Sequence, residues 1–480
     1  MTPLRRLALT ELPAVQPNRR ATLIACIDLL ERGLVERHMA VRLCLLSALA
    51  GEHTLLIGPP GTAKSELGRR LHTVFHGAKY FERLLTRFSV PEEIFGPLSI
   101  KALEEDRYER QTDGFLPNAS IAFIDEVFNA NSAILNALLT LLNEREFDNG
   151  AGRQRCPLIS VIGATNEVPE EEVAEAFFDR FLVRTAVGPV SAAGFDSLVR
   201  QMPNGDLAPS IADLGLHKDV LADIAADAQL VELPTTVIAV LGELRQHLTE
   251  EGIYVSDRRW VKIAWFIRIA AASEGREAAE LWDLLFLPWM TAPDAVRQAT
   301  VAEWLAARLG FREVFSPARL ARVVAAFEAQ LNAELHANEL DYRESGQLKF
   351  SNTDLSGSAG GTNQGAAGPH ISNARPRCYG ETHIAARITQ IDELMHRIAG
   401  YIDEIASHRN SLTAYSAQSM WLDAELLSQA ATVLNGTAAA IENLVDRVRI
   451  VRKGFLDLPK LAEDNHDRPE PIAHESLGDT

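Results

Sequence analysis

Cysteine is scarce in this chain, with four among 480 residues. Cys26, Cys44, Cys156 and Cys378 stand far apart, and no C-x-x-C pair is present. A small fold held by disulfides and a zinc site built on cysteine pairs are therefore both disfavoured. We expect these residues to be buried free thiols.

Long apolar runs are absent as well. The apolar segment at residues 41–50 is interrupted by Arg42, whereas a membrane-spanning helix needs about 20 predominantly apolar residues. The first residues, MTPLRRLALTELP, lack the apolar stretch that a secretory signal requires. We therefore expect no transmembrane segment, no signal peptide and a cytoplasmic location.

Positive charge is in deficit, because 47 basic residues face 65 acidic ones and the net charge is −18. Such a molecule repels phosphate backbones at long range, so nucleic acid is not expected as its main partner. A local basic patch would escape this argument. With 47% hydrophobic and 23% charged residues the chain is globular, and its length predicts two or three domains.

Strands and helices alternate in the first part of the sequence. Short apolar runs followed by turns predict buried parallel strands, and apolar residues at helical spacing predict helices, with Gly33 separating two of them before residue 50. This alternation predicts an α/β domain at residues 1–188, with a parallel sheet sandwiched by helices and the ligand at the carboxyl ends of the strands. The predicted strands are 54–57, 120–124 and 158–163, and helices at 64–75 and 132–142 follow the first two.

The rest of the sequence is predominantly helical. Residues 189–310 show no convincing strand, and residues 311–460 form a second helical region interrupted at about 345–383 by a Gly- and Ser-rich segment that we expect to be flexible. A helix at 317–338 precedes this segment, and a coiled-coil-like antiparallel hairpin with a polar break near Asn410 follows it. The charged residues 461–480 are expected to be disordered. The heptad stripes of the hairpin are Ile384, Ile391, Ile398 and Ile405 with Ile388, Met395 and Ile402, then Leu427, Leu434, Ile441 and Val448 with Ala431, Ala438 and Val445.

The stretch LLIGPPGTAKSE lies between a predicted strand and a predicted helix. Its glycines permit a tight turn in which backbone N–H groups surround an anion at a helix N-terminus. Lys64 would hold the β- and γ-phosphates of a nucleotide, and the Ser65 hydroxyl would be offered to Mg²⁺. The candidate nucleotide-binding residues are Gly58, Pro59, Pro60, Gly61, Thr62, Ala63, Lys64, Ser65 and Glu66.

Ala63 occupies the place of the last glycine in the pattern G-x-x-x-x-G-K-[ST]. We expect this residue to begin the helix with a negative φ, which an alanine adopts without strain. The departure is therefore mild, and the loop is expected to be intact.

Polar residues follow two further predicted strands. Asp125 and Glu126 end the run IAFIDEVF, and Asn166 ends GATN. Beside a phosphate loop, Asp125 can reach Mg²⁺ through water, Glu126 can polarise an attacking water, and Asn166 can report the γ-phosphate. Taken singly, an acidic pair is more often a helix cap and an asparagine a turn residue; the combination favours the catalytic interpretation.

Together the motifs GPPGTAKS, IDEVFNANSAILNALLTLLNEREF, GATNEV and FFDRF resemble those of the AAA+ ATPases of the MoxR branch, and most of all its RavA-type members, over about residues 18–310. The resemblance implies an AAA+ core with a helical lid, ATP and Mg²⁺ as cofactors, and ATP hydrolysis. It implies that Arg180 is an arginine finger reaching a neighbouring subunit. It assigns a second sensor to Arg258, with the adjacent Arg259 as the alternative.

The resemblance further implies a hexameric ring that remodels or activates other protein complexes, commonly with a partner that carries a von Willebrand factor A domain. It places an extra hairpin, directed at substrates or the pore, at residues 94–117. RavA-type proteins can carry a β-barrel that docks a lysine decarboxylase. Residues 340–383 are too short and too rich in glycine for a barrel, so that partnership is doubtful.

Other functions remain open at this stage. One is a scaffold in which nucleotide only switches conformation, and another, disfavoured by the charge, is a DNA-associated motor. GTP is not excluded, because no residue can be named that reads the base. The resemblance implies that residues 33–36 lie where related proteins hold adenine, largely through backbone groups. The heptad hairpin is equally compatible with a structural role and with a partner-binding arm.

Overall fold

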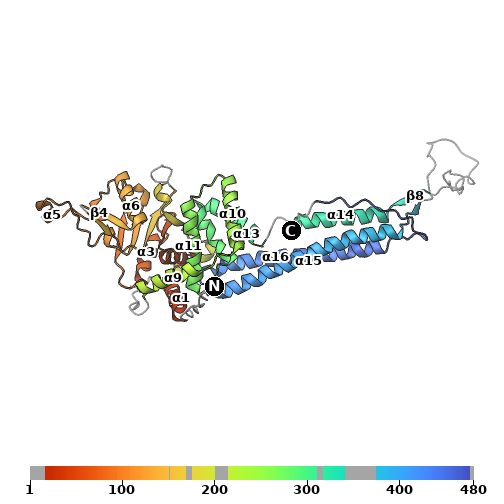
Figure 1. Cartoon of the computed structure of the whole chain (residues 1–480), viewed down its shortest axis with the longest axis horizontal. Coiled ribbons are helices and arrows are strands. Elements are labelled where there is room, and N and C mark those ends of the chain that lie inside the picture. The colour runs from red at the N-terminus through yellow and green to blue at the C-terminus, as the bar shows by residue number, and fades with distance from the viewer. Residues whose placement is uncertain are drawn as a thin grey trace, which may run out of the picture. The chain divides into compact units, whose positions relative to one another are not determined.

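The computed structural model describes residues 17–150, 152–168, 176–200, 215–310, 317–340 and 374–475 (Figure 1). The chain divides into two compact units. The first comprises Met1–Leu309 and Ala414–Ser428, and the second Gly310–Thr413 and Gln429–Thr480.

A five-stranded parallel sheet forms the centre of the first unit, in the order β2-β3-β6-β1-β7. The strand β6 lies between β1 and β3, so the carboxyl ends of these three strands are neighbours at one edge of the sheet. The strands are β1 (His53–Ile57), β2 (Tyr80–Leu84), β3 (Ile121–Asp125), β6 (Ser160–Thr165) and β7 (Phe181–Ala186).

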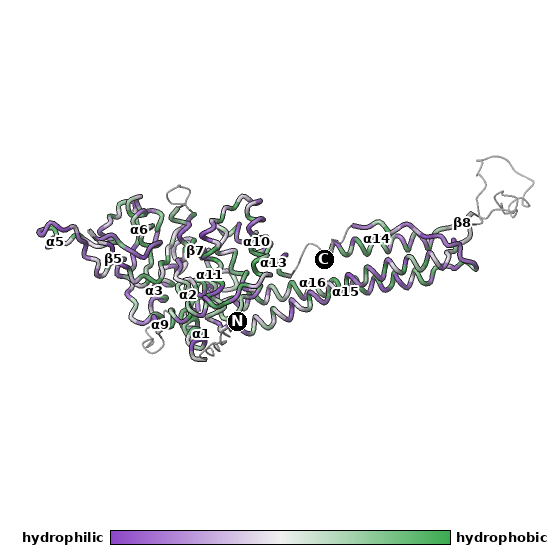
Figure 2. The backbone as a smooth tube through the Cα atoms, viewed as in Figure 1, coloured by the Kyte–Doolittle hydropathy of each residue, from purple (hydrophilic) through white to green (hydrophobic). Residues whose placement is uncertain are grey.

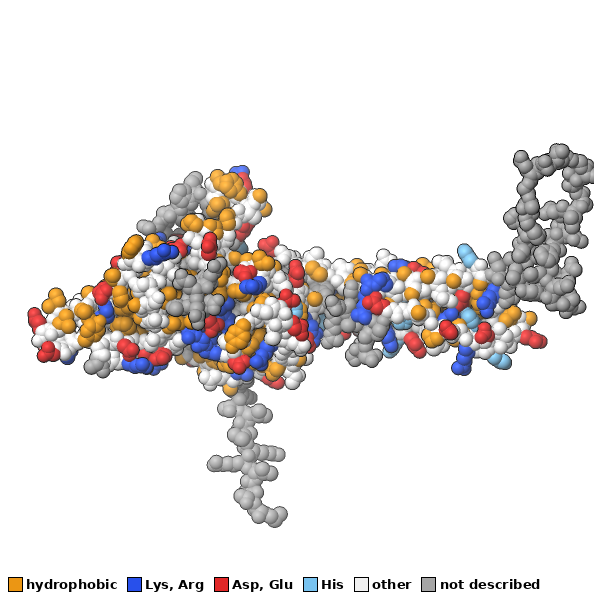
Figure 3. Space-filling model, turned by 90° about the horizontal axis from the view of Figure 1, so that it is seen from above, with side chains coloured by type: hydrophobic (Ala, Val, Ile, Leu, Met, Phe, Trp, Pro, Cys, Tyr) orange, Lys and Arg blue, Asp and Glu red, His pale blue; other side chains and the backbone are white. Residues whose placement is uncertain are grey.

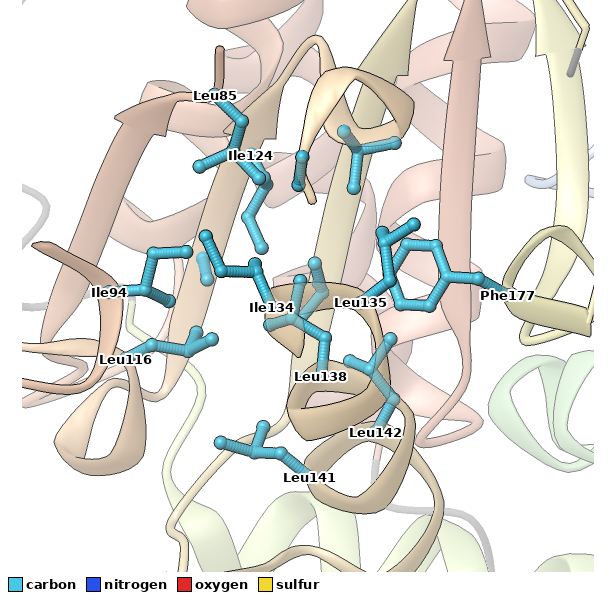
Figure 4. Packing of buried hydrophobic residues seen from close by; sticks show 14 of the residues in the cluster. Leu85, Ile94, Leu116, Ile124, Ile134, Leu135, Leu138, Leu141, Leu142 and Phe177 are labelled. Carbon is cyan, nitrogen blue, oxygen red and sulfur yellow. The ribbon is translucent and has the colours of Figure 1, made fainter. Parts of the chain in front are cut away.

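Helices pack on the sheet because its central strands are apolar on both faces: every residue of β6 is buried. One core cluster joins α6 (Ser132–Glu144) to β3, and Figure 4 shows Ile134 and Leu138 of this helix pointing toward Ile124, Leu116 and Ile94. The remaining helices of the region before residue 188 are α1 (Pro17–Glu31), α2 (His38–Leu49), α3 (Lys64–Thr73), α4 (Glu92–Phe95) and α5 (Ile100–Glu104), with 3-10 turns at Leu116–Asn118 and Val127–Asn129.

The three predicted strands and the helices after the first two are present. Sequence reasoning missed β2 and β7, and also a hairpin of β4 (Glu146–Asn149) and β5 (Gly152–Arg155). Residues 94–117 fold back on themselves, since the backbones of Leu98 and Arg110 form an antiparallel bridge. The expected extra hairpin is thus present in outline.

Helices alone follow β7 in the described part of residues 189–310. They are α8 (Ala192–Arg200), α9 (Lys218–Leu230), α10 (Thr235–Glu250), α11 (Asp257–Glu274), a 3-10 turn at Leu281–Phe286, α12 (Leu287–Thr291) and α13 (Ala295–Gly310). Ser256 caps α11 by accepting a hydrogen bond from the backbone of Arg259. This cap sets the position of the two arginines at the start of the helix.

The second unit is built from α14 (Pro317–Leu335) and most of two long antiparallel helices, α15 (Glu381–Gln418) and α16 (Ala424–Leu456). Hydrophobic and hydrophilic positions alternate along these helices in Figure 2. The stripes that begin at Ile384 and Leu427 are buried as predicted, but the second stripe of each helix is wrong. In α15, Leu394 and Tyr401 are buried, whereas Met395 and Ile402 are only half-buried. In α16, Leu444 is buried, whereas Ala431, Ala438 and Val445 are only half-buried. A helix that packs against two others needs a wider apolar face than one in a two-stranded coiled coil. The second buried position of each heptad therefore lies one residue earlier than the two-stranded pattern predicts.

The hairpin break near Asn410 is also wrong. Helix α15 continues to Gln418, and the turn lies at residues 419–423. A small antiparallel ladder of β8 (Asn338–Leu340) and β9 (Ala374–Pro376) precedes α15. The last part of the segment expected to be flexible, from residue 374 on, therefore contains a strand and the start of α15. Residues 341–373 lie outside the described part of the chain.

The tail after residue 460 was expected to be disordered, yet residues 461–475 pack against the helices of the second unit. Asp464 accepts a hydrogen bond from the backbone of Thr382 (3.2 Å), and the Glu470 carbonyl accepts one from Arg387 (2.7 Å). Beside it, Glu334 of α14 pairs with Arg387 at 2.8 Å and with His383 at 3.0 Å, and its side chain is only 7% exposed. Acidic and basic side chains are interspersed over the face of these helices in Figure 3. Residues 476–480 lie outside the description.

Of the cysteines, Cys26, Cys44 and Cys156 are buried and Cys378 is partly exposed, and all four are free thiols. This confirms the expectation for three of them. Among the residues that the structure describes, no helix has the length and apolar character to cross a bilayer.

Candidate nucleotide-binding site

The phosphate loop joins β1 to α3 and is held by backbone contacts. The N–H of Gly58 donates to the carbonyl of Thr165 at the end of β6 (3.0 Å). A Cβ atom at Gly58 would lie 2.2 Å from the Val187 carbonyl oxygen, so only glycine fits. Thr62 donates its hydroxyl to the Pro59 carbonyl across the loop (3.0 Å). The loop is therefore tightly folded.

Ala63 differs from the expectation. Its φ of 69° and ψ of 21° place it in the left-handed region, as the residue before the first turn of α3, and not at a negative φ. The position thus has the conformation for which glycine is favoured, and the alanine carries some strain. Despite the alanine, the loop has the conformation that a glycine at this position would adopt without strain.

Lys64 is buried, with 7% of its surface exposed. Its ammonium donates to the carbonyls of Gly58 and Pro59 and lies 3.5 Å from Oδ1 of Asn166. Burial lowers the pKa of Lys64, and the nearby carboxylates Asp125 and Glu126 oppose that shift. These hydrogen-bond partners are all neutral oxygens, which leaves the ammonium suited to an anionic ligand.

Glu126 and Asn166 are in contact with each other. The amide of Asn166 donates to Oε1 of Glu126 (2.7 Å), and that of Asn129 to Oε2 (3.2 Å). Glu126 has a left-handed backbone, with φ 50°. Burial and the charge of Asp125 raise the pKa of Glu126, although Lys64 lowers it. Desolvated and held at both oxygens, this carboxylate is suited to accept a proton or orient a water.

The residues present fit magnesium bound together with a nucleotide. Magnesium in such sites uses one or two protein ligands besides phosphate and water. Ser65 on the first turn of α3 and Asp125 at the end of β3 offer a hydroxyl and a carboxylate next to Lys64. No cluster of three or more His, Cys, Asp or Glu side chains in the described ranges could hold a metal by itself. Glu66 is engaged elsewhere, in an ion pair with Arg70 at 2.7 Å.

The carboxylate of Asp179 lies close to the three arginines named in the sequence analysis. It lies 2.7 Å from Arg258, 3.1 Å from Arg259 and 3.8 Å from Arg180. It also approaches Arg184 at 3.9 Å. A single carboxylate thus faces four guanidinium groups, and the buried Nε of Arg180 has no hydrogen-bond partner among the residues that the structure describes.

The two lid arginines are distinguished by their partners. Arg259 has a side chain 4% exposed and donates to the carbonyls of Met290, Phe181 and Leu182. Burial lowers the pKa of Arg259 to about 10. The side chain of Arg258 is 47% exposed. Arg259 therefore joins α11 to β7, and Arg258 is the one able to turn toward a ligand.

Comparison with known proteins agrees with this geometry. A family model described as the MoxR domain in the MoxR-vWA-beta-propeller ternary systems matches residues 21–224, and a model of the AAA lid domain matches residues 236–305. Residues 21–224 are thus a MoxR domain, followed by an AAA lid domain at residues 236–305.

Several proteins are similar to this chain. Two uncharacterized proteins of Methanocaldococcus jannaschii are each 42% identical, over 254 and 251 residues. These matches cover 53% and 52% of the chain and 65% and 66% of the relatives, slightly less than two thirds of their length. A structural protein of Acidianus two-tailed virus is 33% identical over 160 residues, which are 32% of this chain and 26% of that protein. The crystal structure of a presumed ATPase from Cytophaga hutchinsonii matches with a TM-score of 0.48 and 18% sequence identity. The match covers 60% of this chain and 94% of that one.

The MoxR-type core also presents residues that sequence reasoning missed. Arg37 is buried and donates to the Thr62 carbonyl of the phosphate loop (3.2 Å) and to the Gly188 carbonyl (2.6 Å). Trp289 of α12 lines the same pocket as Arg37. An arginine after a short glycine-containing linker and a tryptophan in a helical region carry no motif, so only the fold reveals them.

Proposed function

We propose that this protein is a Mg²⁺-dependent ATPase that works as a ring, most simply a hexamer, and remodels or activates partner protein complexes. The observation that carries the proposal is Lys64, a buried ammonium bonded to neutral oxygens next to Glu126. The matches to the MoxR domain and to the AAA lid domain support the reaction.

The chemistry follows from the positions of the side chains. The loop N–H groups and Lys64 would hold the phosphates, and Ser65 and Asp125 would hold the metal, which would neutralise charge on the phosphates. Glu126, fixed by Asn166, orients the water, and Asn166 couples that orientation to the lysine. Arg180 acts on a neighbouring subunit, and Arg258 leaves Asp179 for the bound nucleotide.

The test compares ATP turnover and ATP binding in the parent, in Glu126→Gln and in Glu144→Gln. The last variant is a matched control, because Glu144 belongs to an exposed ion pair on α6. We expect Glu126→Gln to lose at least about 100-fold in turnover and to keep binding, with the control unchanged. Unchanged turnover in Glu126→Gln would refute the assignment. If client activation survived that loss, the scaffold alternative would hold instead.

The ring has its own test. Arg180→Ala and Lys64→Ala should each be inactive, but mixed rings should regain turnover, because a Lys64→Ala subunit can lend its arginine to an intact neighbouring loop. A mixture that stays inactive under conditions of subunit exchange contradicts an arginine acting in trans. Light scattering with and without nucleotide gives the number of subunits.

A partner with a von Willebrand factor A domain is proposed from the family's description, which places the MoxR domain in ternary systems with such proteins. Trapping the ATP-bound state with Glu126→Gln should enrich that partner in a pull-down. Enrichment by Lys64→Ala to the same level would show that any association is independent of nucleotide.

A further inference from the structure

A pocket of about 580 Å³ opens between four parts of the first unit. Its lining includes the connection from α1 to α2, the end of β7, Trp289, and the turn between α15 and α16 together with the start of α16. The volume is within the range of small-ligand sites. The residues that the argument uses are Arg37, Met39, Ala186, Trp289, Asp423 and Glu425.

This pocket adjoins the phosphate loop. Arg37 lines it and donates to the Thr62 carbonyl of that loop (3.2 Å). Ala186 lines it from β7 and pairs in the sheet with Ile57, the last residue before the loop. A nucleotide whose phosphates occupy the loop would therefore extend its nucleoside toward this pocket.

The turn that carries Asp423 is fixed in place by contacts within the first unit. Trp421 is fully buried and donates its indole N–H to Ser273 (2.8 Å). The Leu422 carbonyl accepts from Arg42 (2.8 Å), and the backbone N–H of Met420 donates to Glu274 (2.7 Å). The backbone N–H of Asp423 itself lies 3.2 Å from the sulfur of Met39, another residue of the pocket. These contacts fix the turn in place as one side of the pocket.

Most charged groups of the lining already have partners. Both carboxylate oxygens of Glu36 accept from Ser191, Arg37 donates to backbone carbonyls, and His38 pairs with Glu31 (2.7 Å). Asp423 uses one oxygen to accept from the backbone N–H of Glu425 (3.1 Å). Across the described ranges neither Asp423 nor Glu425 has an ion-pair partner. Their carboxylates remain as acceptors in the pocket.

We propose that Asp423 and Glu425 accept hydrogen bonds from the nucleoside of the bound nucleotide, so that the turn of the C-terminal hairpin is part of the nucleotide site. Carboxylates bind ribose hydroxyls or a base amino group and repel phosphates, which fixes the direction in which the nucleotide lies. The proposal rests on the proposed ATP binding. It gives α15 and α16 a direct contact with the nucleotide at the point where they meet.

The first experiment measures nucleotide affinity by calorimetry with a non-hydrolysable ATP analogue and Mg²⁺. Asp423→Asn keeps the acceptor for the Glu425 N–H, and Glu425→Gln keeps its size, so both should fold. We expect about tenfold weaker binding in each, while Glu442→Gln, an exposed position on α16, binds as the parent does. Parent-like affinity in both Asp423→Asn and Glu425→Gln overturns the proposal.

Two analogues identify the group of the nucleoside that donates to the carboxylates: 2′-deoxy-ATP lacks a ribose hydroxyl, and purine riboside triphosphate lacks the base amino group. The parent should bind one of them more weakly than ATP, and the responsible variant should lose that difference. If both variants keep the parent's preference between ATP and each analogue, the carboxylates do not read the nucleoside. If instead the parent does not bind ATP, or Lys64→Ala binds it equally well, the proposed function fails rather than this inference.

A second measurement uses the unmodified protein. Addition of ATP should slow amide hydrogen exchange in residues 414–428, and Lys64→Ala should show no such change. Exchange in this segment that is unaffected by saturating ATP contradicts a contact between turn and nucleotide.

Discussion

Replacement of Ala63 by glycine tests whether the phosphate loop is strained. The left-handed backbone of Ala63, with φ 69°, costs an L-residue about 1–2 kcal/mol. Glycine removes that strain but loses about 0.5–1 kcal/mol through the greater freedom of the unfolded chain. The net expectation is a gain of about 0.5 kcal/mol in the free energy of unfolding.

The control is the same replacement at Ala226, an exposed residue inside α9. There the backbone is helical, and glycine should destabilise the protein by about 1 kcal/mol. Because both changes alter the unfolded chain alike, the difference of about 1.5 kcal/mol isolates the strain at Ala63. It corresponds to a separation of about 4 °C between the two Tm values.

Thermal unfolding monitored by intrinsic fluorescence measures this separation, and calorimetry measures ATP affinity. Affinity in Ala63→Gly should stay within about twofold of the parent, because the loop conformation is unchanged, whereas Lys64→Ala should abolish binding. Equal losses of Tm in the two glycine variants would show that the loop stores no strain. A tenfold loss of affinity in Ala63→Gly would show that the methyl group contributes to the site.

Carboxylates carry the remaining predictions. Burial and a neighbouring carboxylate raise the pKa of Glu126 above 4.5, so ATP turnover should fall as the pH drops through that raised value. Glu126→Gln should lack this loss of turnover at acid pH. A parent profile that is flat down to pH 4.5 contradicts a role of the Glu126 carboxylate in turnover. Asp179→Asn leaves four arginines without their shared partner and should lower the free energy of unfolding by about 2 kcal/mol. Asp257→Asn, in an exposed pair, should lower it by less than about 0.5 kcal/mol. Equal Tm values in the two variants would refute a stabilising role for the Asp179 cluster. Glu334→Gln should cost about 3 kcal/mol in the helical unit, and Glu328→Gln, in a more exposed pair, much less; circular dichroism melting distinguishes them.

Much of the nucleotide site was predictable because its signals are local. A short apolar run, two glycines and a lysine predict strand, loop and helix together, and the ends of parallel strands bring Asp125 and Asn166 to the same edge. The backbone at Ala63 was predicted wrongly, since a helix start and a left-handed residue before it have the same sequence. Strand β2 was missed because its residues YFERL include the charged pair of an edge strand.

Contacts distant in sequence account for the other errors. The polar stretch at Asn410 resembles a helix end, but α15 continues because Tyr415 is buried and donates its hydroxyl to Asp283 (2.9 Å). The wall provided by Asp423 could not be inferred from a pattern, since two acidic residues after a tryptophan have no characteristic spacing. Only the return of the chain to the first unit places them at the pocket.

That return has a practical meaning for anyone who divides this protein into parts. The first compact unit is not one continuous stretch of chain: it ends at Leu309 and is completed by Ala414–Ser428. Ending the polypeptide before the long helices would remove Trp421, whose side chain is fully buried, and leave a cavity of indole size with Ser273 lacking its donor. An inactive truncated ATPase would therefore report an incomplete core, and the role of the helical hairpin is better tested by shortening both helices equally, outside residues 414–428.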